Sequence, residues 1–353
     1  MRIIKFLINI SSLNFVTGDE RMIFILSTLL LFTSVKGNSQ TYEEYHREIS
    51  TAEEFYFLKN NVDSSLHYYQ YGFESFDFIF AKDAVNALQI AYREGRSIDY
   101  FLKRAMQSGV TPSILENIPA LSNFVKDSLP QLSVMRDYDL HRSHYLDRIN
   151  VECLNKIYKL GIKDQIDKNK KGKRQNYNEN TLDLLFDLAL KYGLPGEKNC
   201  GIEDSKINKE LGKGAEDFLH LRDSISAIYG VNIRYFKLYP NSLGMHLPIV
   251  IMLHNYCTYK DHQKALHEAY LEGFIHPREI GNIYDNAFRG YGSECLIVPN
   301  RGIFILNGAL QTRGKNIEKA NRLRTEWNIC SIETDQKKKE LQELGYIFIW
   351  DYW

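Results

Sequence analysis

Residues 78–109 read FIFAKDAVNALQIAYREGRSIDYFLKRAMQSG, and this stretch decides the fold class. It predicts a helix over about 78–93 that ends at Gly95, because glycine readily adopts the left-handed conformation that closes many helices. A second helix is expected over Ser97–Gln107, with the serine as its N-cap and Gly109 as its stop. The stretch is therefore predicted to form a helical hairpin.

The preceding residues follow the same plan. A helix is expected over about 42–59, a turn at 60–62, and a second helix that Asp63 caps and that reaches about Glu74. Asp63 and Ser97 are 34 positions apart. The sequence thus predicts two consecutive copies of one helix-turn-helix unit.

These two copies resemble tetratricopeptide (TPR-like) repeats, which have this period. Asn61 and Gly95 fall at the turn inside each repeat, and Tyr71 and Ala105 share a position in the second helix. The resemblance covers about 70 residues and departs from the family at Tyr71, where a small residue is usual. It implies stacked hairpins with a concave surface that suits extended ligands.

Two repeats cannot bury a continuous hydrophobic face, so further helices must pack on them. Residues 111–132 are expected to form a degenerate third unit, interrupted by Pro112, Pro119 and Pro130. We therefore assign residues 40–132 to TPR-like helical repeats.

The first 39 residues are predicted to be a signal peptide. The apolar segment Met22–Val35 has 14 residues, too few to span ~30 Å of hydrocarbon at 1.5 Å per residue. Gly37 and Ser39 offer cleavage sites. The biological start is either Met1 or Met22, and an uncleaved membrane anchor is the alternative. We expect export to the periplasm or the cell exterior, with no stable transmembrane span after cleavage.

The composition of the 353 residues is that of a globular protein with no net charge, since 44 basic residues balance 44 acidic ones. No global field would attract nucleic acid, so no nucleic-acid partner is predicted. The basic run Lys168–Arg174 is expected to be a solvated loop. Five cysteines without a Cys-x-x-Cys pair allow two disulfides and one free thiol, in any connectivity.

Residues 133–353 are predicted to form an all-α domain with at most a few short strands. A polar insertion is expected at 197–213 and short strands at 231–238 and 346–350. The expected helices cover about 140–163, 181–192, 217–229, 247–257, 260–273, 277–288, 316–327 and 335–344.

One candidate metal site lies at the end of the most apolar predicted helix. His254 and Cys257 are three apart and share a helix face, and His262 or His267 would complete the ligand set. The alternative is that the first two are core residues and the other two are solvated. No zinc motif, phosphate loop, dinucleotide fingerprint or Gly-x-Ser-x-Gly elbow occurs, so enzyme classes with such signatures are unsupported, no cofactor-binding residue is predicted, and any cofactor stays unknown.

A second polar cluster contains Asp285, Arg289, Tyr291 and Glu294. These residue types either carry out acid-base chemistry or cap helices and hold loops.

The second half, from about Leu154 to Leu344, resembles an uncharacterised bacterial family that is often exported, a domain of unknown function. The matching segments are Asp164-Gln165, Asn180–Leu185, Tyr192-Gly193-Leu194-Pro195, Gly201, Leu253-His254, Asp285, Tyr291-Gly292-Ser293-Glu294 and the stretch 316–327. Leu253, Asn286 and Ser293-Glu294 replace the glutamine, arginine and Thr-Gln of the family. The resemblance implies that His254, Asp285 and Tyr291 line a common pocket.

Two functions follow from these features. The repeats favour an exported module that binds a protein or peptide, or that serves as a scaffold. The alternative is a hydrolase-like enzyme with a pocket at His254, Asp285 and Tyr291, and convergence of these three side chains would distinguish the two.

Overall fold

The described part of the chain is helical and contains no strand, which confirms the all-α class. The structure is a computed structural model that describes residues 40–171, 179–204, 207–212, 214–230, 243–291, 295, 303–306 and 317–350. Within the helices, side chains are not described at 168–171, 179–180, 229 and 289–291. The predicted signal peptide and the predicted strand at 231–238 lie outside the described residues.

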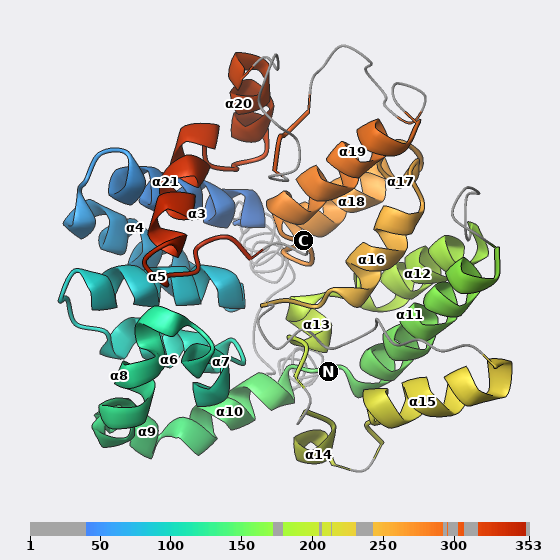
Figure 1. Cartoon of the computed structure of the whole chain (residues 1–353), viewed down its shortest axis with the longest axis horizontal. Coiled ribbons are helices and arrows are strands. Elements are labelled where there is room, and N and C mark those ends of the chain that lie inside the picture. Colours follow the sequence, from blue (N-terminus) through green and yellow to red (C-terminus); the bar gives the residue numbers. More distant parts are fainter. Residues whose placement is uncertain are drawn as a thin grey trace, which may run out of the picture. The chain divides into compact units, whose positions relative to one another are not determined.

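Two helical hairpins begin the described chain (Figure 1). Their helices are α3 (Tyr42–Phe57), α4 (Val62–Ser75), α5 (Ala81–Arg93) and α6 (Asp99–Gln107). Gly95 adopts a φ of 61° just after α5, as predicted. Both predicted N-caps are wrong. The side chain of Asn61, not Asp63, accepts the backbone N–H of Ser64, and α6 begins after Ile98 without a side-chain cap.

The two repeats differ in how they bury their second helix. Tyr71 is 51% exposed, whereas Ala105 is fully buried, although a period of 34 residues equates them. Gly72 is the buried small residue of α4 and lies against Ile49 of α3. The equal spacing along the chain therefore does not give equal packing at these positions.

Short helices follow, each starting near a proline or a polar cap. Thr111 caps α7, in which Pro112 is the first residue, and Pro119 and Pro130 lie in the short helices η1 and η2. These elements are α7 (Pro112–Glu116), η1 (Pro119–Leu121), α8 (Ser122–Asp127), η2 (Leu129–Gln131) and α9 (Ser133–Arg136). The predicted interruptions at the prolines match these short elements.

Two helices replace the single one predicted over 140–163. They are α10 (Tyr138–Asp147) and α11 (Val151–Lys171). The break occurs because the side chain of Asn150 accepts the N–H of Cys153 and caps a new helix. The next helix, α12 (Glu179–Tyr192), ends at Gly193 as predicted.

The predicted polar insertion at 197–213 is partly helical and partly buried. It contains α13 (Glu197–Cys200) and α14 (Ile207–Leu211) and buries Glu197, Asn199 and Glu203. The Asn199 amide donates to the carbonyl of Tyr192 at 3.0 Å, and its oxygen accepts the N–H of Gly196. This segment is therefore part of the core and not a solvated loop.

The remaining helices follow the predicted order with different limits. They are α15 (Phe218–Tyr229), α16 (Leu247–His254), α17 (Thr258–Asp261), α18 (Gln263–Leu271), α19 (Pro277–Tyr291), α20 (Ile317–Glu326) and α21 (Ile332–Gln342). The helix predicted to reach Cys257 ends at His254, and the helix predicted over 260–273 is divided between α17 and α18. The tail Tyr346–Trp350 is not a strand.

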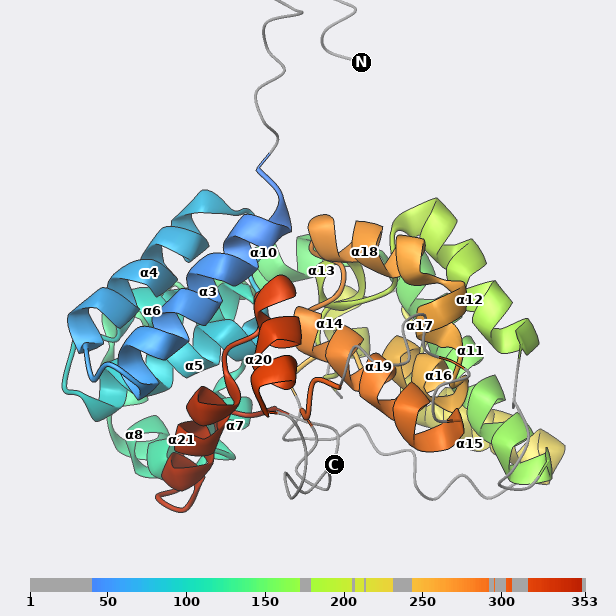
Figure 2. The same ribbon diagram turned by 90° about the horizontal axis from the view of Figure 1, so that it is seen from above.

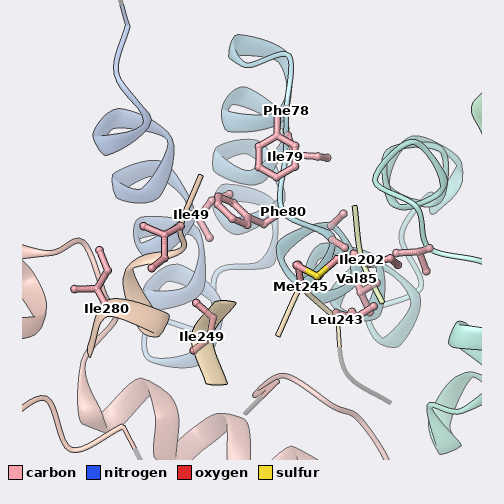
Figure 3. Packing of buried hydrophobic residues seen from close by; sticks show 14 of the residues in the cluster. Ile49, Phe78, Ile79, Phe80, Val85, Ile202, Leu243, Met245, Ile249 and Ile280 are labelled. Carbon is pink, nitrogen blue, oxygen red and sulfur yellow. The ribbon is translucent and has the colours of Figure 1, made fainter. Parts of the chain in front are cut away.

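The core is centred on α5, in which every residue from Ala81 to Ala91 is buried. Phe80, which leads into this helix, contacts the rings of His46 and His276. Apolar side chains from both halves of the sequence meet around it (Figure 3). Those labelled there include Ile49, Phe78, Phe80, Val85, Ile202, Leu243, Met245, Ile249 and Ile280.

Helices from the two ends of the chain share this core. Figures 1 and 2 show α21 lying beside α3 and α5, and α18 also contacts α3. Residues 41–353 form one compact unit. The division near residue 132 into repeats and a second domain stays a prediction from sequence. None of the described helices is both long and apolar enough to cross a membrane.

Gly109 provides a test of how closely the repeat half packs on α10. A Cβ atom there would lie 2.4 Å from the ring of Tyr145, and its φ is 99°. Gly109→Ala should lower the free energy of unfolding by about 3 kcal/mol, from backbone strain plus overpacking. Gly95→Ala has similar strain (φ 61°) but open space, and should lose only about 1 kcal/mol. Equal losses in urea unfolding would contradict this packing.

Candidate functional site

His254 forms a close pair with a fully buried aspartate. Its Nδ1 lies 2.6 Å from Oδ2 of Asp164, which belongs to α11. The side chain of Asp164 is 0% exposed, whereas that of His254 is 14% exposed at the end of α16. The pair therefore joins a buried carboxylate to an imidazole that reaches the surface.

The carboxylate determines which ring nitrogen carries the proton. An aspartate accepts the N–H of Nδ1 in the neutral ring, so the basic lone pair is on Nε2. The Gln165 amide also donates to Oδ2, at 3.3 Å. The other oxygen of Asp164 is buried and accepts no hydrogen bond within the described residues. The main polar contact of this buried charge is thus the imidazole.

Three segments named in the family resemblance meet at this pair. Asp164 and Gln165 lie on α11, Leu253 and His254 end α16, and α19 contributes Asn286. The amide of Asn286 donates to the carbonyl of Leu253 at 2.6 Å. In the sequence, the only signal for a role of Asp164 is that Asp164-Gln165 is one of the segments of the family resemblance.

Asp285 holds a loop, which is the second of the two roles predicted for its cluster. Its carboxylate is buried and accepts the backbone N–H groups of Phe304, at 2.7 Å, and Leu306, at 3.1 Å. Burial raises its pKa to about 6 against the opposing effect of these hydrogen bonds. The carboxylate of Asp285 thus anchors the backbone at 304–306, and its convergence with His254 and Tyr291 stays a prediction. The side chains of Tyr291 and Arg289, and all of Glu294, lie outside the described residues.

The candidate metal ligands are not brought together. Cys257 lies beyond the end of α16 and forms a disulfide with Cys295, so it offers no thiolate. The ring of His262 stacks on Phe186 with centroids 3.7 Å apart, and His267 packs edge-on against Trp327. No group of three or more His, Cys, Asp or Glu side chains able to hold a metal occurs within the described ranges.

A network of buried charges joins the two ends of the chain, and the sequence did not reveal it. Lys82 of α5 pairs with Glu279 of α19 at 3.1 Å, and Lys338 of α21 pairs with Glu53 of α3 at 2.5 Å. Polar residues spaced along α5 suggest a solvated stripe. Only the folded chain shows that α19, α21 and the tail cover them.

A small, partly open cavity lies within this network. Its volume is about 30 Å³, enough for one or two water molecules. His46 lines it and has no hydrogen-bond partner for either ring nitrogen among the described residues. Burial holds the pKa of His46 well below its ordinary value, so the ring is neutral. The cavity is too small for an organic substrate.

Two further glutamates are buried, each beside a backbone N–H group. Glu197 accepts the N–H of Ala81 at 3.0 Å, and Glu203 accepts that of His246 at 2.9 Å. Burial raises the pKa of each carboxyl to about 8. Both groups are therefore largely protonated at neutral pH.

An open groove of about 350 Å³ lies between α6 and α10. Arg148 lines it, and its Nε and Nη2 are buried without a hydrogen-bond acceptor. Its guanidinium lies over the ring of Phe78 and forms no ion pair within the described part of the chain. Burial accordingly lowers its pKa. The groove also contains Asp77 and Asp147.

Comparison with family models, curated proteins and solved structures gives no match for this chain.

The raised pKa of Glu197 predicts a pH effect on stability. A carboxyl with a folded pKa of about 8 and an ordinary value of 4.5 stabilises the fold while protonated, and this contribution is lost as pH rises to about 8. Glu197→Gln should match the wild type at pH 4.5 and exceed its free energy of unfolding at pH 9, by on the order of 4 kcal/mol. The exposed Glu340→Gln should have little effect at either pH. Denaturant unfolding at both values measures this, and an unchanged difference would contradict it.

Proposed function

We propose that this chain is an exported, hydrolase-like enzyme in which His254 is the general base and Asp164 orients it. The 2.6 Å contact between a buried carboxylate and a surface-reaching imidazole carries this proposal. Histidine is the side chain that most often acts as a general base in enzymes.

The two side chains differ in exposure, which distinguishes this pair from a purely structural hydrogen bond. Asp164 is fully buried, and one of its oxygens has no hydrogen-bond partner among the described residues. Burying a carboxylate in this way costs free energy, so such a group is usually kept for a role, here the orientation of His254. His254 retains solvent contact at the end of its helix. This arrangement holds the ring in one orientation and stabilises its charged form after it takes a proton.

The chemistry would be proton transfer to and from a water nucleophile. Nε2 removes a proton from water as the water attacks the scissile bond, and the resulting imidazolium returns the proton to the leaving group. The carboxylate of Asp164 keeps its negative charge throughout and lowers the energy of the imidazolium.

Export is supported by two independent features. The predicted signal peptide precedes the folded unit, and Cys257 and Cys295 form a disulfide, a bond that persists in oxidising compartments.

The enzyme hypothesis predicts a specific pattern of loss among variants. The wild type is first tested on a panel of ester, amide, glycoside and phosphoester substrates to find one that it cleaves. On that substrate, His254→Gln and Asp164→Asn should each lower the rate of hydrolysis at least 100-fold. His220→Gln, at an exposed position of α15, is the matched control and should retain full activity. No hydrolysis across the panel, or equal activity of all variants, would refute the proposal.

A second candidate, binding of a protein or peptide through the repeat half, is favoured by the groove beside Arg148. A buried guanidinium without a counter-ion destabilises the free protein, and an anionic group of a ligand would relieve this. The nearby Asp77 and Asp147 would attract a positive group on the same ligand. These charges suit the end of a peptide or a charged segment of a protein.

Comparison of two arginines tests whether Arg148 is retained for binding. Arg148→Met should leave the free energy of unfolding unchanged or raise it by about 1 kcal/mol, since no ion pair is lost. Arg142→Met should lower it by about 3 kcal/mol, because this arginine pairs with Asp204 and Glu210. A partner captured from envelope extract should be lost with Arg148→Met. Destabilisation by Arg148→Met equal to that of Arg142→Met would indicate a structural role.

A further inference from the structure

Two cysteines distant in sequence lie side by side in the core. The Sγ atoms of Cys153 and Cys200 are 3.4 Å apart, with the Cys200 thiol donating to Cys153. Both residues are 0% exposed and are 47 positions apart. The sulfurs would need to approach by only about 1.4 Å to reach the length of a disulfide bond.

Backbone hydrogen bonds hold the two thiols in place. The N–H of Asn150, three residues before Cys153, donates to the carbonyl of Asn199, directly before Cys200, at 2.7 Å. Cys153 donates its own N–H to the side chain of Asn150, and Cys200 donates its N–H to Gly196 at 2.8 Å. The meeting of the sulfurs therefore follows from the ends of α11 and α13 and not from a mobile loop.

We propose that Cys153 and Cys200 form a second disulfide, so that the mature chain carries two disulfides and one free thiol, Cys330. Each thiol loses one proton and the pair loses two electrons as the S–S bond forms. A disulfide oxidant accepts the electrons and is reduced to two thiols. This inference is independent of the acid-base proposal.

The burial of both sulfurs determines when the bond can form. Because both sulfurs are buried in the folded chain, the bond must form while α13 is still docking on α11. An oxidant in the compartment of folding is therefore sufficient, and no opening of the native core is needed.

The third free cysteine, Cys330, has different neighbours from Cys153 and Cys200. It is also buried, but its Sγ lies near Asp335 Oδ1, at 3.4 Å, and Lys338 Nζ, at 3.5 Å. Burial raises the pKa of this thiol well above its ordinary value. We therefore expect it to stay reduced.

Counting the free thiols tests the proposal. The full chain is reduced, unfolded, and refolded in a buffer of reduced and oxidised glutathione, which makes the test independent of export. It is then denatured without reductant, treated with N-ethylmaleimide and weighed intact. Four of the five cysteines are paired in the proposed state, so one adduct is expected, at Cys330. Three adducts would mean that only Cys257 and Cys295 are paired and would overturn the proposal.

Two variants and a peptide map assign the bond. Cys153→Ser should give two adducts, at Cys200 and Cys330, whereas Cys330→Ser should give none. A non-reducing digest of the wild type should contain one linked peptide joining Cys153 to Cys200. This map needs no variant to fold, and a link from either cysteine to Cys330 would refute the assignment.

Discussion

The ion pairs between α3 and α21 and between α5 and α19 are the interaction on which the described fold depends. Lys338 is 2% exposed and lies 2.5 Å from Glu53, and Lys82 is 8% exposed and lies 3.1 Å from Glu279. Removing one partner from such a buried pair typically costs about 3–5 kcal/mol, because the other charge is left uncompensated. The ion pairs therefore join α3 to α21 and α5 to α19, so helices from the two ends of the described chain stabilise each other.

The C-terminal segment also explains how α5 can contain polar residues and still lie in the core. Gln89 donates to the carbonyl of Ile347 at 2.6 Å and accepts its N–H at 2.8 Å, as the backbone of a neighbouring strand would do. Asn86 accepts the indole N–H of Trp350 at 3.0 Å. Side-chain amides of α5 thus form the hydrogen bonds that the C-terminal segment would otherwise lack, since this segment has no sheet partner within the described residues. Hydrogen-bond geometry fixes where the tail lies.

The sequence predicted local elements well and long-range roles poorly. Local patterns identified α3, α4, α12, α19 and α20, because start signals, stop signals and apolar spacing lie within each helix or beside its ends. These patterns could not show that Glu197 is buried, since its hydrogen-bond partner Ala81 is 116 positions away. Asp285 was expected beside His254 because both belong to one motif set. In the fold its carboxylate holds the amides of Phe304 and Leu306, a contact that no local pattern encodes.

The candidate catalytic pair depends on a small residue one helical turn away. A Cβ atom at Gly161 of α11 would lie 2.9 Å from Leu247, the first residue of α16. Asp164 is three residues further along α11 and lies on the same face. The absence of a side chain at Gly161 thus lets α11 and α16 approach closely enough for Asp164 to reach His254. The position of His254 relative to Asp164 is therefore set by packing between two helices, and the proposed role of the pair depends on that packing.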